Sequence, residues 1–161
     1  MIKSTFNIQL TPTKICDLET LYQFQLDIEA AYLAAFMPND STNKSAYIIK
    51  YTKLLANPTV KNFTIIIDNT IVGSIATFII ENLTHITYWI DKKYWGKGIA
   101  TAALKNLLLI EASRPIFASV AFDNYSSQKV LEKCGFIKTG VEKGFANARQ
   151  AVIEEFTYKL N

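Results

Sequence analysis

The sequence predicts a mixed α/β fold, in which a central sheet of antiparallel and parallel strands is flanked by about four helices. After a first segment of strand or coil, two stretches with helical spacing of apolar residues occur before residue 58. Three β-branched or aromatic runs follow between residues 63 and 90, separated by short polar breaks. A helix, a strand, a helix and two strands complete the order. This order favours a sheet that begins as an antiparallel meander and gains a parallel strand later.

The two N-terminal helices are predicted from their ends and their apolar stripes. Asp17 can cap the first helix, which runs toward Pro38, and its stripe consists of Leu18, Leu21, Tyr22 and Leu26. After the polar stretch NDSTNKS, a second stripe begins at Tyr47 and ends before Asn57 and Pro58. Two helices therefore precede the middle of the chain.

The three strand-like runs lead to a glycine-rich turn. The runs are FTIII, IVGSIATFII and HITYWI, and the polar breaks between them are DNT and ENLT. Residues 91–104 read DKKYWGKGIATAAL, so a buried helix begins directly behind Gly96 and Gly98. Because this helix joins HITYWI to the next strand, PIFASVAF, the two strands should run parallel through a right-handed crossover. The glycine turn then lies at the carboxyl end of the first of them.

The last third of the chain contains one more helix and two strands. Asn124 can cap the helix and Gly135 can end it, and the strands are expected at about residues 136–141 and 151–160. The chain has 161 residues, half of them hydrophobic, which suits one core. We therefore expect a single domain over residues 1–161.

Composition excludes several classes of protein. The net charge is +3 and the lysines are scattered, which argues against a nucleic-acid partner and suits a small anionic ligand. No segment, residues 1–10 included, approaches the roughly 20 apolar residues of a membrane span. The two cysteines, Cys16 and Cys134, are far apart and His85 is the sole histidine, so neither a disulfide framework nor a metal site is expected. A cytoplasmic protein without a metal, nucleic acid or membrane partner is the expectation.

The glycine turn is a candidate phosphate site. Amides at the start of a helix lack intrahelical partners, and Gly96 and Gly98 allow a phosphate to approach them. Lys92, Lys93 and Lys97 add positive charge, which suits a diphosphate. In the alternative interpretation the glycines only form a tight turn. A Walker loop is excluded because GKGIAT lacks its Gly-Lys-Ser/Thr ending, and a dinucleotide fold is disfavoured because its glycine turn normally comes first.

Two motifs, KYWGKG at residues 93–98 and NYSS followed by LEKCGF at residues 124–136, occur in the order expected for one family. They resemble the GNAT family of acyl-CoA-dependent N-acyltransferases, whose signature is Arg or Gln, two residues, Gly, any residue, then Gly or Ala. Lys93 replaces the first residue and keeps a positive charge. The residues of the two motifs are most similar to those of the ribosomal-protein N-terminal (Rim-type) acetyltransferase branch. The order of helices and strands also fits the family fold.

The resemblance implies that the turn holds the diphosphate of acetyl-CoA, the co-substrate that donates the acetyl group. It also implies that the strand end before the turn binds the pantetheine arm. The implied acetyl-CoA-binding residues are Trp89, Ile90, Asp91, Lys93, Trp95, Gly96, Lys97, Gly98, Ile99, Ala100, Thr101, Asn124 and Ser127. The implied activity is transfer of the acetyl group to a primary amine by direct attack in a ternary complex, and a homodimer is a family-level expectation.

Proton transfer to the departing thiolate requires a donor that the family motif does not supply here. Many members carry a tyrosine seven residues after the asparagine, but this position is Leu131. Ser127 matches a serine of the Rim-type branch and is the first candidate, with Tyr125 as the second. Ser127 can equally be a polar residue that satisfies the first helical turn.

The amine must lose a proton before it attacks, and Glu154 and His85 are the candidate bases. Alternation in the last strand puts Glu154 on the apolar face, where its neutral form would be favoured. His85 begins the strand before the glycine turn, and an imidazole titrates in the useful range. Glu154 can instead be an edge carboxylate in water, and His85 an exposed residue after ENLT. Asp27 and Glu29 fall where the family builds its acceptor site, although a solvated helix face explains them better.

The acceptor is the open part of this prediction. Tyr22, Tyr32, Phe36 and Tyr51 are candidates for an acceptor pocket, or else belong to the core. An N-terminal peptide, a polyamine and an aminoglycoside all remain possible acceptors. The missing tyrosine keeps a non-catalytic acyl-CoA-binding module as the main alternative function, and a nucleotide-binding domain with a different ligand as a second.

Overall fold

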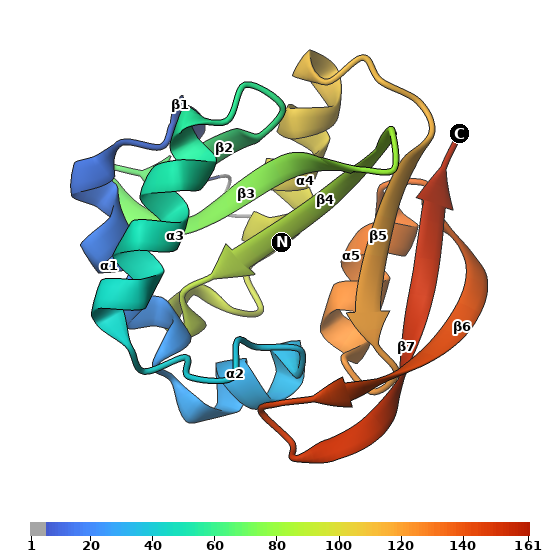
Figure 1. Cartoon of the computed structure of the whole chain (residues 1–161). Coiled ribbons are helices and arrows are strands. Elements are labelled where there is room, and N and C mark those ends of the chain that lie inside the picture. The colour runs from blue at the N-terminus through green and yellow to red at the C-terminus, as the bar shows by residue number, and fades with distance from the viewer. Residues whose placement is uncertain (1–5) are drawn as a thin grey trace.

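The computed structural model describes residues 6–161, and the predicted mixed α/β fold is confirmed. Within these residues a seven-stranded sheet has the order β1-β2-β3-β4-β5-β7-β6 (Figure 1). The strands are β1 (Ile8–Pro12), β2 (Lys61–Ile67), β3 (Thr70–Ile80), β4 (Leu83–Ile90), β5 (Ile116–Ala121), β6 (Ile137–Ala146) and β7 (Ala151–Leu160). The helices are α1 (Leu18–Gln25), α2 (Ile28–Ala34), α3 (Lys44–Ala56), α4 (Ile99–Ile110) and α5 (Tyr125–Lys133), with short 3-10 segments η1 (Ile15–Asp17) and η2 (Lys92–Tyr94).

The predicted antiparallel meander and the predicted parallel crossover are confirmed. Strands β1 to β4 pair with their sequence neighbours in antiparallel fashion, and β4 and β5 are parallel, joined through α4. Strand β7 then inserts between β5 and β6 and runs antiparallel to both. The glycine turn accordingly follows the carboxyl end of β4, in the middle of the sheet.

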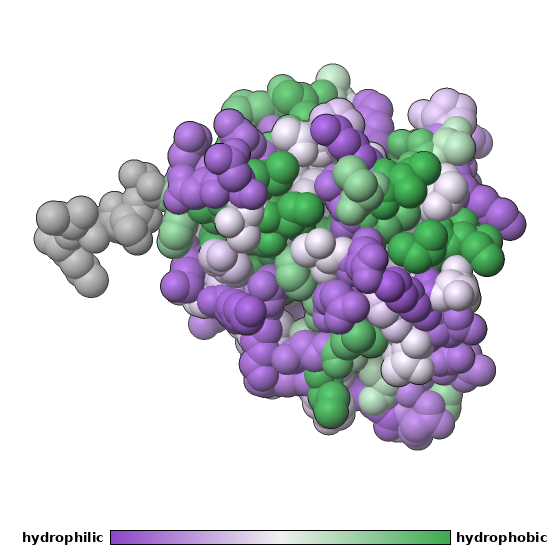
Figure 2. All heavy atoms as spheres, turned by 90° about the vertical axis from the view of Figure 1, so that its left-hand side faces the viewer, coloured by the Kyte–Doolittle hydropathy of each residue, from purple (hydrophilic) through white to green (hydrophobic). Residues whose placement is uncertain are grey.

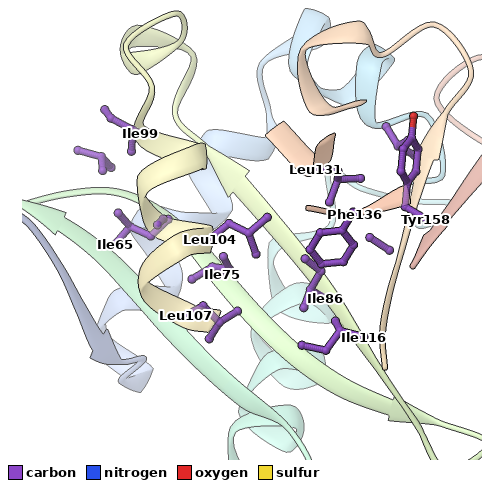
Figure 3. Packing of buried hydrophobic residues seen from close by; sticks show 14 of the residues in the cluster. Ile65, Ile75, Ile86, Ile99, Leu104, Leu107, Ile116, Leu131, Phe136 and Tyr158 are labelled. Carbon is purple, nitrogen blue, oxygen red and sulfur yellow. The ribbon is translucent and has the colours of Figure 1, made fainter. Parts of the chain in front are cut away.

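Helix α4 packs its apolar stripe against one face of the sheet (Figure 3). Ile99, Leu104 and Leu107 are at most 2% exposed and share a core cluster with residues of the strands and of α5. Burying one such side chain stabilises the fold by about 1.5–3 kcal/mol. This packing fixes the N-terminus of α4, and with it the glycine turn, relative to the strands.

The prediction of one continuous first helix is wrong, because α1 and α2 are separated at Leu26 and Asp27. Asp27 has an extended backbone, and its carboxylate accepts a hydrogen bond from the N–H of Ala30 at 2.9 Å, which begins a new helix. Asp17 precedes α1 without capping it, since its side chain accepts hydrogen bonds from the N–H of Lys14 and the hydroxyl of Thr64. Aspartate competes with the helical backbone in this way wherever its side chain reaches an N–H.

Both predicted ends of α5 are confirmed. The side chain of Asn124 accepts a hydrogen bond from the N–H of Ser127 at 3.4 Å. Gly135, at φ 90°, ends the helix with the paired backbone hydrogen bonds of a Schellman motif. Strand β6 is longer than expected and continues to Ala146, because it pairs with β7 along nearly its whole length.

One face of the molecule is mixed in polarity. On the face shown in Figure 2, hydrophobic patches lie among hydrophilic residues. No helix among residues 6–161 has both the length and the apolar character needed to cross a membrane. The same part of the chain holds no cluster of three or more His, Cys, Asp or Glu side chains suited to a metal ion. Residues 1–5, part of the segment considered above for a membrane span, lie outside the described residues.

Candidate active site

The sheet opens between β4 and β5. These strands pair only at Thr84 with Ile116 and at His85 with Phe117, and they then diverge toward the end of the molecule where α2 lies (Figure 1). Two cavities flank the opening. One, the glycine-turn cavity, has a volume of about 380 Å³ and the other, the α3 cavity, about 410 Å³. Five residues line both: Ala34, Tyr88, Trp89, Asn124 and Ser127.

The glycine turn leaves open space above the start of α4. Gly96 and Gly98 have φ of 74° and 79°, a backbone conformation that favours glycine, and a Cβ atom on either would meet nothing within 4 Å. Both glycines line the glycine-turn cavity together with Ile99, Ala100 and Thr101, the first residues of α4. An anion in this space would face free amides and the positive end of the helix dipole.

The positive charges around this cavity differ from the predicted set. Lys92 turns toward α2 and pairs with Glu29 at 2.7 Å and with Asp27 at 3.7 Å; the hydrogen bond to Glu29 raises the pKa of Lys92. Two lysines of α5, Lys129 and Lys133, line the cavity instead. Their spacing of four residues puts them on one face of the helix that Asn124 begins, which is the sequence signal that could have identified them.

The end of β4 is held in a fixed conformation. The indole N–H of Trp95 donates to the carbonyl of Ile90 at 2.9 Å, and the N–H of Asp91 donates to the carbonyl of Val72 at 2.8 Å. Of the predicted acetyl-CoA contacts, Trp89, Ile90 and Trp95 line the glycine-turn cavity. Asp91, Lys93 and Lys97 are not among its lining residues.

The junction of the two cavities contains a tyrosine that sequence reasoning missed. The hydroxyl groups of Tyr88 and Ser127 share a hydrogen bond of 2.6 Å, and burial raises the pKa of Tyr88 to about 12. The side chain of Asn124 donates to the carbonyl of Leu33 at 3.3 Å, which ties α5 to α2 beside the junction. Leu131, where many family members carry a tyrosine, is 1% exposed and packs in the core. A hydroxyl pair from β4 and α5 thus lies at the point where the cavities meet.

Tyrosines of α3 form one wall of the α3 cavity. The rings of Tyr47 and Tyr51 lie 4.3 Å apart, and burial raises the pKa of both. Phe36 also lines this cavity, as the sequence suggested for Phe36 and Tyr51. Tyr22 supports the wall from α1, with its ring 5.2 Å from Tyr47. The ring of Tyr32 lies under the guanidinium of Arg149 instead.

The two predicted bases lie outside the residues that line these cavities. Glu154 shares a face of β7 with Phe156 and Tyr158, as alternation indicated. Its side chain is nevertheless exposed, and its partner across the β6–β7 hairpin is Lys143. His85 lies between the rings of Phe78 and Phe117 at the closed end of the β4–β5 pair. Burial lowers its pKa. Neither side chain is brought to the junction of Tyr88 and Ser127.

The acetyltransferase (GNAT) domain family matches residues 7–137, which is most of the chain. The chain therefore belongs to the GNAT acetyltransferase family, and the resemblance stated from the motifs is confirmed. No curated protein matches the sequence.

Solved structures with this fold include acetyltransferases of different specificity. The microcin C7 self-immunity acetyltransferase MccE, in complex with acetyl-CoA and AMP, is 20% identical with a TM-score of 0.80, over 95% of this chain and 91% of that one. RimL, the ribosomal L7/L12 α-N-protein acetyltransferase, is 21% identical with a TM-score of 0.80, over 99% and 92%. A spermidine N-acetyltransferase SpeG chimera from Vibrio cholerae and hSSAT is 17% identical with a TM-score of 0.74, over 93% of each chain.

Proposed function

We propose that this GNAT acetyltransferase moves an acetyl group from acetyl-CoA to a primary amine by direct attack in a ternary complex. The observation that carries the proposal is the meeting of two cavities at Tyr88, Asn124 and Ser127. Two cavities that share a short wall can bring two substrates into contact without a covalent enzyme intermediate. Acetyl-CoA would occupy the glycine-turn cavity and the amine the α3 cavity.

The glycine-turn cavity suits the diphosphate and pantetheine of acetyl-CoA. The space above Gly96 and Gly98 would receive the diphosphate, next to the N-terminus of α4, with Lys129 and Lys133 on the other side. The complex of MccE with acetyl-CoA supports this choice of donor. The two free cysteines, Cys16 exposed and Cys134 half-buried, support a reducing compartment, the cytoplasm, as the site of the reaction.

Tyr88 and Ser127 would serve the sulfur of the leaving group. With a pKa of about 12, Tyr88 stays protonated at neutral pH, so the hydroxyl pair has a proton to offer when the carbon–sulfur bond breaks. The departing thiol has an ordinary pKa of about 8.5, so this help accelerates the reaction without being indispensable. Loss of either hydroxyl should lower the turnover rate more than the affinity for acetyl-CoA.

The class of acceptor is proposed from the chemistry of the α3 cavity and from the relatives. Asp40 lines the cavity and offers a negative charge to a cationic amine, and Lys50, whose ammonium lies over the Tyr51 ring, is the positive charge of the same lining. RimL acts on a protein α-amine and SpeG on spermidine, so a peptide N-terminus and a polyamine are the first amines to test.

A non-catalytic acyl-CoA-binding module is the second candidate, favoured by Leu131 in place of the family tyrosine and by the distance of Glu154 and His85 from the junction. A measurement of catalytic turnover distinguishes the enzyme from the binding module.

In this experiment, free CoA is measured with a thiol reagent while the protein is mixed with acetyl-CoA and a short peptide, spermidine or an aminoglycoside. Release of CoA that depends on the amine supports the enzyme, whereas binding without release supports the module.

Binding itself is tested by thermal unfolding. Acetyl-CoA at 100 times its dissociation constant should stabilise the fold by about 2.7 kcal/mol, which raises Tm by roughly 5–11 °C for a chain of this size. Gly98→Asp and Gly98→Asn form a matched pair, since both residues tolerate positive φ and only one adds a negative charge. The rise in Tm that acetyl-CoA causes should be much smaller for Gly98→Asp than for Gly98→Asn. No shift for the wild type at millimolar acetyl-CoA would refute the proposed donor.

A further inference from the structure

The register of β7 puts Glu155, and not Glu154, on the same face of the sheet as Ser119, a residue that lines the α3 cavity. Ser119 pairs with Thr157 and Ala121 with Glu155, so Ser119 and Glu155 are diagonal neighbours on one face. The Ser119 hydroxyl lies near enough to the Glu155 carboxylate to lower the pKa of that carboxyl. Because successive residues of a strand point to opposite faces, Glu154 is directed away from Ser119.

Ser119 lies where the sheet has just opened. It is two residues beyond Phe117, the last residue of β5 that pairs with β4, and it lines the α3 cavity. Thr87, two residues beyond His85 on the parallel β4, lines the same cavity at the same level. A ligand in the α3 cavity therefore reaches the Ser119 hydroxyl, and through it the half-buried carboxylate of Glu155.

The surroundings of Glu155 favour its protonated form. Burial raises the pKa of this carboxyl, the nearby Ser119 hydroxyl lowers it, and the carboxylate of Glu142, opposite on β6, raises it again. On β5 the facing residues Ser119 and Ala121 carry no charge. From the other side of the cavity, the charged groups that line it are Asp40 and Lys50.

We propose that Ser119 contacts the acceptor amine and that Glu155, acting through Ser119, receives the proton that the amine loses before it attacks. The inference rests on the proposed function and assigns residues to the removal of the amine proton, a step for which the proposed function names no residue. Ser119 is the group that touches the substrate, and Glu155 is a positioning residue that keeps the serine hydroxyl directed and takes up its proton.

The proposed step balances in protons and electrons. An ammonium group gives one proton to the Ser119 oxygen while the Ser119 proton moves to the Glu155 carboxylate. The neutral amine then forms the nitrogen–carbon bond, the carbon–sulfur bond breaks, and the electron pair leaves with the sulfur. The second amine proton goes to that sulfur through Ser127 and Tyr88, and Glu155 returns its proton to solvent.

The pH dependence of kcat/KM tests the inference, with acetyl-CoA saturating and the best of three amines, a short peptide, spermidine or an aminoglycoside, as the probe. For the wild type, kcat/KM should rise with pH through the pKa of Glu155. Glu155→Gln and Ser119→Ala should each lower kcat by about 100-fold or more, the usual contribution of such a proton acceptor. Glu142→Gln removes a neighbouring negative charge, so it should move the acid limb to lower pH while keeping the rate on the plateau.

Thr157→Val is the matched control, because Thr157 lies on the same strand and face as Glu155 and does not titrate there. Its profile should match that of the wild type, and all variants should retain the acetyl-CoA-dependent rise in Tm. A Glu155→Gln rate and acid limb equal to those of the wild type would overturn the inference, as would a loss confined to Glu154→Gln. If the wild type binds acetyl-CoA but acetylates none of the amines, the proposed function fails and this inference fails with it.

Discussion

Arg149 joins three segments around the candidate site. Its guanidinium forms two hydrogen bonds with Asp123, of 2.6 and 2.7 Å, and its Nε donates to the carbonyl of Tyr32 at 2.9 Å. The side chain is 5% exposed and its charge lies over the Tyr32 ring. Asp123 directly precedes Asn124, the cap of α5. Arg149 therefore connects the turn between β6 and β7 with α2 and with the start of α5.

Replacing Arg149 with Met keeps most of the apolar volume and removes all these hydrogen bonds. Breaking a buried ion pair from one side costs about 3–5 kcal/mol, and because Asp123 retains 25% exposure to water, we expect about 3 kcal/mol. At roughly 3 °C per kcal/mol for a chain of this length, Tm should fall by about 9 °C. Arg114→Met is the control, since Arg114 is exposed and donates only to two nearby carbonyls. It should cost less than about 1 kcal/mol.

The effect of Arg149→Met should also depend on pH. Arg149 holds the pKa of Asp123 below its usual range, so the pair stabilises the fold above the unfolded pKa of about 3.9 and loses this contribution as the pH falls through the folded value. Urea unfolding at several pH values should therefore show the gap between wild type and variant narrowing below about pH 4. A loss under about 1 kcal/mol at pH 7, or a gap that does not depend on pH, would refute the reasoning.

Three further changes test other parts of the structure. Gly73→Ala should destabilise the fold by about 1–3 kcal/mol in urea unfolding, because the new Cβ would lie 2.2 Å from a backbone carbonyl of β4; equal stability would mean that β4 moves freely there. Tyr88→Phe and Ser127→Ala should each lower kcat with little change in acetyl-CoA affinity, and wild-type kcat in both would remove the hydroxyl pair from the mechanism. Neutralising Lys129 and Lys133 with glutamine should weaken acetyl-CoA binding in titration calorimetry and reduce its salt dependence, whereas unchanged affinity would exclude them from the site.

Local signals in the sequence predicted the parts of the fold that depend on neighbouring residues. The positive φ of Gly96 and Gly98, the cap at Asn124 and the end at Gly135 all follow from residue types that favour those backbone conformations. The break at Asp27 was missed because the apolar stripe continues across it, although aspartate is a good cap. The capping hydrogen bond joins residues only three positions apart, so the sequence contained the local signal for a helix start. The apolar periodicity outweighed this signal in the prediction.

The residues that meet at the site could not be predicted from local sequence. Tyr88 and Ser127 are 39 positions apart, and their contact depends on how α5 packs against β4. Alternation correctly put Glu154 and Glu155 on opposite faces of β7, but it could not show that Glu155 is the one that shares a face with Ser119. The apolar face of β7 packs under α5 near Tyr158 and leaves Glu154 in solvent, so apolar neighbours in sequence did not mean burial.

The short pairing of β4 with β5 makes the sheet two leaves joined along a seam. Strands β1 to β4 form one leaf and β5 to β7 the other, and two pairs of residues link them directly. Beyond those pairs, the facing edges of β4 and β5 pair with no other strand among residues 6–161, so a substrate with amide groups would find unpaired strand edges on both sides of the seam. In the proposed complex, substrate and sheet would be parts of one hydrogen-bonded structure, and a bound substrate would link the two leaves where the protein itself does not.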